Sequence, residues 1–232
     1  MDWTALIGPA VVAAAVSGVV SIAGMIVSNR NARALHQDKL SFDRRMAQEK
    51  LSFDKELAEH KFQLDLDMTH RKRQLELAEA VLTDFYGLPA LVRSIRSPMS
   101  YQEEAKDRVK PAGESEAVGR RRDTFYVILA RVEKSRKEIA DLLAKRSRME
   151  ANFGKEAGEP FQLVHEAINQ VIVSAQLLVQ WAGDDIRDRE LLRKMEGDIW
   201  FGVLDPDPVA SKIDQAVAAI EGICSPIIRK AA

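Results

Sequence analysis

The first part of the chain is a long apolar stretch without a charged residue between Trp3 and Asn29. Its centre, from Ala5 to Val27, reads ALIGPAVVAAAVSGVVSIAGMIV. About 20 apolar residues suffice for a helix to cross the hydrocarbon core of a bilayer, where only a helix or a closed barrel can satisfy its backbone groups. The pattern therefore predicts a transmembrane anchor over residues 1–29.

Charged residues flank this anchor unevenly. Asp2 stands ahead of it, whereas the segment after it carries Arg30, Arg33 and Lys39. A cleaved signal peptide is the competing interpretation, but signal peptides have a basic region ahead of the apolar run. The positive-inside rule instead predicts a single-pass plasma-membrane protein whose C-terminal side stays in the cytoplasm.

Small residues gather on one face of the predicted anchor. They follow one another at steps of three and four, and are Ala13, Ser17, Ser21, Gly24 and Ser28. Small residues let helices approach closely in lipid. The pattern predicts that the anchor self-associates through Ala13, Ser17, Ser21 and Gly24, although any span rich in Ala, Gly and Ser can show such a stripe by chance.

An eleven-residue repeat follows the anchor. The unit KLSFD occurs at residues 39–43 and again at 50–54, and degraded copies occur as KFQLD at 61–65 and KRQLE at 72–76. Eleven residues in three helical turns lie close to the natural period, so a helix with this repeat stays nearly straight or winds slightly right-handed. The repeat predicts a helical stalk, of the coiled-coil kind, over residues 30–86.

Two rows of mostly apolar residues run along this stalk. Both rows alternate steps of seven and four, and at 100° per residue they lie about 140° apart around the helix. The first row consists of Leu35, Phe42, Met46, Phe53, Leu57, Leu64, Met68 and Leu75. The second row consists of Leu40, Ala47, Leu51, Ala58, Phe62 and Thr69.

Two rows on separate sides of one helix favour partners on both sides, and hence a parallel oligomer of stalks. Residues 29–86 contain eleven basic and eleven acidic residues, and the two signs alternate between the rows. This balance disfavours a helix lying on the membrane surface, because such helices are usually basic. A monomeric stalk folded against the C-terminal helices remains an alternative.

Residues 87–232 are predicted to form a C-terminal bundle of three or four antiparallel helices, joined by the returning end of the stalk. Gly87 and Pro89 are expected to break the stalk helix, since proline cannot donate a backbone hydrogen bond. The sequence thus predicts an all-α protein with three parts: a transmembrane helix, an eleven-residue-repeat stalk and a helical bundle.

Helical spacing defines the elements of this bundle. One helix is expected from Glu116 to the glycine at 154, and a more apolar one, the candidate for the bundle centre, over 161–182. Asp184 and Asp185 are predicted N-caps of the next helix, and Asp207 is the predicted N-cap of a final helix that starts at the following proline.

Composition and chemistry narrow the function classes further. Nucleic-acid-binding proteins are usually strongly basic. The formal net charge of this chain is −1, so no nucleic-acid partner is expected. The single cysteine, Cys224, rules out an internal disulfide and a Cys-only zinc site, and its place among apolar residues predicts burial. The sequence contains no phosphate-binding glycine loop. The four histidines are scattered at His36, His60, His70 and His165. We therefore expect no catalytic, cofactor-binding or metal-binding residues and no enzyme activity.

The segment from 71 to 86, RKRQLELAEAVLTDFY, stands behind the anchor and the repeated KLSFD units, and the chain ends with a helix around Lys212 to Cys224. Together these features resemble uncharacterised membrane-anchored helical proteins of bacteria over most of the chain. The resemblance implies a bacterial inner membrane and no particular activity. A weaker similarity is to the peripheral-stalk b subunit of rotary ATP synthases, from which the compact C-terminal part departs.

These observations predict a non-enzymatic membrane-anchored scaffold that self-associates through stalk and anchor. Its partners would be the lipid bilayer, further copies of itself, and a protein that docks on the cytoplasmic helical domain. The alternative is a membrane-acting effector or sensor whose transmembrane helices assemble into a pore or signal across the bilayer.

Overall fold

The computed structural model describes residues 8–183 and 188–231, and among these residues it contains helices and no strand. The chain is therefore all-α, as predicted. Contacts divide it into an N-terminal unit, Met1–Met68, and a C-terminal unit, Thr69–Ala232, which are described separately below.

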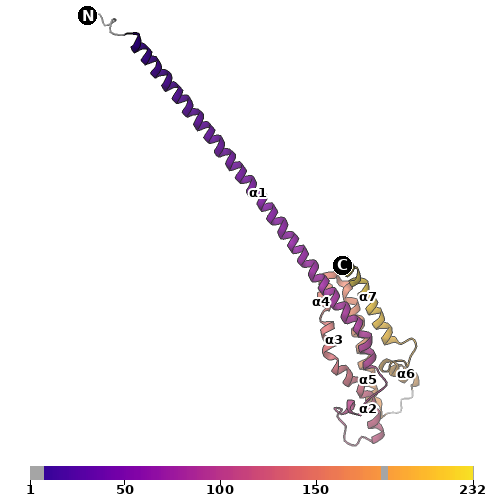
Figure 1. Cartoon of the computed structure of the whole chain (residues 1–232). Coiled ribbons are helices and arrows are strands. Elements are labelled where there is room, and N and C mark those ends of the chain that lie inside the picture. The colour runs from indigo at the N-terminus through magenta and orange to yellow at the C-terminus, as the bar shows by residue number, and fades with distance from the viewer. Residues whose placement is uncertain (1–7, 184–187, 232) are drawn as a thin grey trace. The chain divides into compact units, whose positions relative to one another are not determined.

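A single helix, α1 (Pro9–Ile95), contains most of the predicted anchor and the whole stalk (Figure 1). The first seven residues of the predicted anchor lie outside the described part of the chain. The expected break at Gly87 and Pro89 is wrong, because α1 continues for six residues beyond the proline. The loss of one backbone hydrogen bond at Pro89 is offset by neighbouring side chains, Leu88 and Val92, which are buried on either side of it.

The last part of α1 belongs to the core of the C-terminal unit. From Ala78 onward its buried residues recur at steps of three and four, as one buried helix face requires. The buried residues are Leu77, Ala78, Val81, Phe85, Leu88, Val92 and Ile95. Phe85 meets Phe161 edge to face, with ring centroids 5.0 Å apart. The end of the predicted stalk, from Thr69 onward, thus lies within the C-terminal unit.

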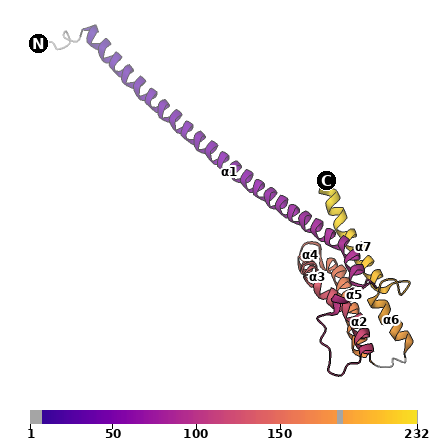
Figure 2. The same ribbon diagram turned by 60° about the horizontal axis from the view of Figure 1, so that its bottom comes forward.

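The other helices of the C-terminal unit surround an apolar core (Figures 1 and 2). They are η2 (Gln102–Ala105), α2 (Glu116–Lys134), α3 (Arg136–Leu143), α4 (Arg146–Phe153), η3 (Lys155–Gly158), α5 (Glu159–Trp181), α6 (Arg189–Ile199) and α7 (Pro208–Ala231). Helix α5 packs against α2, α6 and α7. Its buried face includes Phe161, Val164, Ile168, Val171 and Leu178.

One of the predicted helix N-caps is confirmed. Asp207 caps α7, because its Oδ1 accepts hydrogen bonds from the backbone N–H groups of Val209 and Ala210 at 3.0 Å each. The predicted caps Asp184 and Asp185 lie outside the described residues, and the N-cap of α6 is Asp188.

The single helix expected over 116–153 is instead three helices, α2, α3 and α4. The first interruption falls at Ser135, whose backbone leaves the helical region at φ −92° and ψ 1°. The end of α4 falls at Gly154, as expected, where φ is +93°. Only glycine adopts this conformation readily.

Candidate interaction sites

The predicted oligomerisation residues of the N-terminal unit all lie on its surface. Every side chain from 11 to 73 is exposed, including Ala13, Ser17, Ser21 and Gly24 of the small-residue face. In the first row, Leu35 is 76% exposed and Phe53 is 63% exposed. Leu75 lies in the C-terminal unit and is partly buried there.

Such exposure leaves the apolar side chains of both rows uncovered within the N-terminal unit. Burying one Leu, Phe or Met side chain is worth about 1.5–3 kcal/mol. Singly scattered exposed apolar residues are normal on soluble proteins, whereas contiguous ones mark interaction sites. The two rows are contiguous along one helix, so the stalk offers an apolar surface on each of two sides.

The start of α1 is long and apolar enough to cross a membrane. This helix contains an apolar stretch of 18 residues, and none of that stretch is buried against other parts of the chain. A helix of this kind in a soluble protein would be covered by other helices. By length and composition it suits a bilayer of ordinary thickness.

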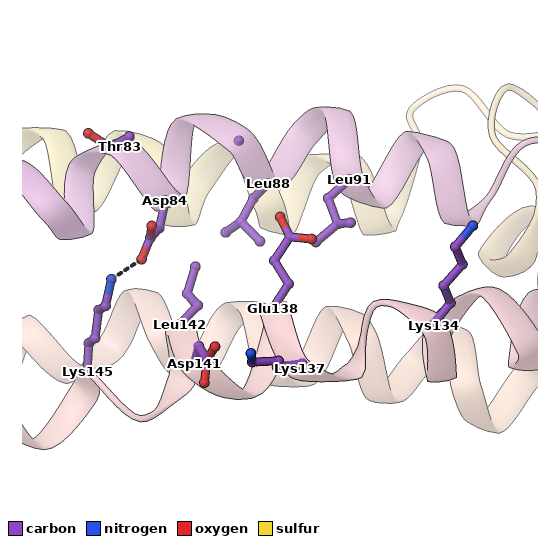
Figure 3. Close-up of a pocket in the computed structure, with 11 residues that line it drawn as sticks. Thr83, Asp84, Leu88, Leu91, Lys134, Lys137, Glu138, Asp141, Leu142 and Lys145 are labelled. Atoms are coloured by element: carbon purple, nitrogen blue, oxygen red, sulfur yellow. Dashed lines mark hydrogen bonds and ion pairs between the residues drawn. The ribbon is translucent and has the colours of Figure 1, made fainter.

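The C-terminal unit contains a cleft of about 590 Å³ between the last part of α1 and α3 (Figure 3). Leu88 and Leu91 of α1 face Leu142 of α3 across it. An ion pair between Asp84 and Lys145 closes one end. The charged residues of the lining are Asp84, Lys134, Lys137, Glu138, Asp141 and Lys145.

The charges of this cleft balance, because its lining contains three lysines and three carboxylates. A polyanion such as nucleic acid would meet as much repulsion as attraction there. A protein segment with an apolar centre and charges of both signs would find complementary groups. The cleft is therefore suited to a peptide or helix of mixed charge.

A buried arginine joins three elements next to the end of α1. Arg96 is completely buried. Its Nε donates to the carbonyl of Asp198 at 2.8 Å and its Nη2 donates to the carbonyl of Gly197 at 2.7 Å. The same Nη2 lies 2.9 Å from Oδ2 of Asp207. This side chain therefore ties α1 to the end of α6 and the start of α7.

The carboxylate of Asp198 forms a second buried polar group beside this junction. Oδ1 accepts a hydrogen bond from Gln170 Nε2 at 2.6 Å, and Oδ2 accepts one from Ser174 Oγ at 2.7 Å. Lys212 of α7 donates to Gln170 Oε1 at 2.8 Å. Buried polar groups of this kind fix one arrangement of neighbouring helices, here α5, α6 and α7.

A cluster of ion pairs holds the connection between η2 and α2. Arg108 donates through Nη2 to Glu114 at 2.8 Å and through Nε to Asp123 at 2.6 Å. Arg122 donates to the other oxygen of Glu114 at 2.8 Å. Hydrogen bonds from Arg108 and Arg122 lower the pKa of Glu114. The connection between η2 and α2 therefore contains a nearly buried carboxylate, that of Glu114.

The four histidines and the cysteine do not form a shared site among the described residues. His36, His60, His70 and His165 are all exposed. Cys224 is buried in α7, and this burial raises the pKa of its thiol to about 11, so it is protonated at neutral pH. Among residues 8–183 and 188–231, no three His, Cys, Asp or Glu side chains gather as metal ligands would.

Sequence reasoning did not single out Arg96, Arg108 or Asp198. The position of Asp198 contained a usable signal, because it stands between Met195 and Ile199 on the buried face of α6. A carboxylate at such a position needs a partner.

Comparisons with protein families, with curated proteins and with solved structures each find no match to this chain.

Proposed function

We propose that this protein is a non-enzymatic scaffold of a bacterial inner membrane. Its single transmembrane anchor is the apolar start of α1, its stalk self-associates, and its C-terminal unit is presented to a partner protein in the cytoplasm. The observation that carries the proposal is the union, in one helix, of a membrane-compatible span and two exposed apolar rows.

Anchoring favours association of the stalks. Anchors in one bilayer hold the copies parallel and at high effective concentration, so weak stalk contacts are enough to form an oligomer. Each copy offers exposed leucine, phenylalanine and methionine side chains along the first row. Burial of these side chains between copies is the driving force for assembly.

The basic residues behind the span support a cytoplasmic position for the C-terminal unit. Arg30, Arg33 and Lys39 follow the apolar stretch directly, and such residues are retained on the cytoplasmic side. The mixed-charge cleft between α1 and α3 is then the surface best suited to a cytoplasmic partner.

A substitution in the first row tests the scaffold. Phe53→Asp places a charge where the stalks would meet, and the full-length protein in mild detergent should become monomeric by light scattering. Ser52→Asp is the matched control, because Ser52 is the preceding residue and lies on the polar side of the helix. An unchanged mass for Phe53→Asp would refute self-association through the stalk.

A further inference from the structure

The stalk carries a regular series of charges between its two apolar rows. Each repeat contributes one lysine and, four residues later, one aspartate; we call these residues the charge ladder: Lys39, Asp43, Lys50, Asp54, Lys61 and Asp65. The two signs strictly alternate along the helix. All six residues are exposed in the N-terminal unit.

Helical geometry places the charge ladder inside the angle between the rows. At 100° per residue, Lys39 lies about 40° and Asp43 about 80° around the helix from Leu35. The second row, at Leu40, lies about 140° from the same point. The charge ladder is thus flanked by an apolar row on each side, while the remaining face of the stalk is polar, with Ser41, Arg45 and Ser52 among its residues.

The same series continues in phase into the apolar span. Ser17, Ser28 and Lys39 follow one another at intervals of eleven residues, and Ser21 belongs to the series of Asp43. The charge ladder and these three serines therefore form one polar line along α1, which drifts around the helix by about 20° per eleven residues at 100° per residue. A polar line that keeps its phase from the span into the stalk points to one common environment along its length.

We propose that further copies of this chain cover both rows, in a closed parallel ring in which the charge ladder faces the shared axis. The first row of each copy packs on the second row of the next. This inference rests on the self-association proposed above and specifies its geometry. Contacts that do not close on themselves would produce open filaments, whereas a ring satisfies every copy equally.

The angle between the rows determines the side that faces inward. In a closed ring, the two contacts of each rod form an angle that opens toward the axis, and the charge ladder lies within this angle. An angle of about 140° is wider than the right angle of a four-membered ring, so the ring contains more than four copies.

The alternating signs balance the charge that this arrangement gathers at the axis. With the copies parallel and aligned, identical residues share a level, and each level of lysines lies about 6 Å from a level of aspartates, from the rise of four helical residues. Every lysine of the charge ladder therefore has carboxylates about one turn away, on its own chain and on the neighbouring copies. The axis then carries no net charge from the ladder, while the shared bilayer holds the copies parallel.

Disulfide formation between identical positions tests which face is inward. Asp54→Cys lies on the charge ladder, and Ser52→Cys lies on the opposite, polar face. The unaltered protein is the control, because its cysteine, Cys224, is buried. Under mild oxidation of the full-length protein in membranes, Asp54→Cys should form crosslinked dimers and Ser52→Cys should remain monomeric on denaturing gels.

The outcomes separate this arrangement from self-association itself. Crosslinking of Ser52→Cys in place of Asp54→Cys, in an oligomer of unchanged mass, would overturn the inward-facing ladder and leave the scaffold proposal standing. An unaltered protein that is monomeric in detergent and in membranes would refute both.

Charge reversal gives a second, independent test. Lys50→Glu places like charges next to Asp54 along the axis, so about tenfold more protein should be needed for half-assembly, and 1 M salt should restore assembly by screening. Arg45→Glu removes the same charge from the outer polar face and should leave assembly unchanged. An equal, salt-insensitive effect of both variants would contradict the arrangement.

Discussion

The buried guanidinium of Arg96 provides a sharp test of how the C-terminal unit is held together. Arg96→Met keeps most of the apolar stem and removes the charged head. The carbonyls of Gly197 and Asp198 then lose their donor, and the carboxylate of Asp207, whose side chain is 12% exposed, loses its counter-charge.

The size of the effect follows from these contacts. Removing one partner of a buried pair typically costs about 3–5 kcal/mol, because the other charge stays buried. Whole domains are stable by only about 5–15 kcal/mol. With a urea slope of about 2 kcal/mol per molar, we expect the unfolding midpoint to fall by about 2 M.

Urea titration of the full-length protein in detergent, followed by tryptophan fluorescence, measures this change, since Trp181 and Trp200 lie in the C-terminal unit. Arg93→Met is the matched control. Arg93 is exposed and lies over the ring of Phe201, 4.7 Å from its centroid, which is worth about 0.5–1 kcal/mol. Equal midpoints for the two variants would refute the role assigned to Arg96.

Three further predictions concern the C-terminal unit. The pKa of Glu114 is lowered by Arg108 and Arg122, so the contribution of Glu114 to stability is present at neutral pH and is lost as pH falls through the lowered pKa. The melting temperature should therefore fall less between pH 7 and pH 3 in Glu114→Gln than in the unaltered protein. Identical profiles of melting temperature against pH would count against the ion-pair cluster. Cys224, with its pKa raised to about 11, should react with a thiol reagent at pH 8 only after urea unfolding; fast labelling of the folded protein would show that α7 does not cover it. Gly154→Ala should cost about 1–3 kcal/mol, because φ is +93° there; an unchanged melting temperature would contradict the conformation of this turn.

Periodicity revealed much of the helical architecture in advance. The apolar run after Trp3 and the seven-and-four spacing from Leu35 onward each predicted helix. Helix α1 contains the run from Pro9 onward and all of the spaced positions. Local chemistry was equally informative at Asp207, where a capping carboxylate stands before Pro208. These signals are reliable because each depends on residues close together in the chain.

The features that the sequence predicted wrongly, or did not predict, depend on tertiary packing. Pro89 lowers helix stability locally, yet Leu88 and Val92 are buried against helices that come much later in the chain, and α1 continues. The partners of Arg96 lie about a hundred residues away, and no local pattern relates them. The cleft between α1 and α3 likewise combines residues from distant segments.

The proposed function depends above all on the apolar start of α1, which would hold the protein in a bilayer. Membranes from cells that produce the full-length protein can be washed with alkaline carbonate, sedimented, and the protein measured by immunoblot and intact mass. We expect full-length protein in the pellet. Protein released into the supernatant, or shortened by removal of its first thirty residues, would contradict it.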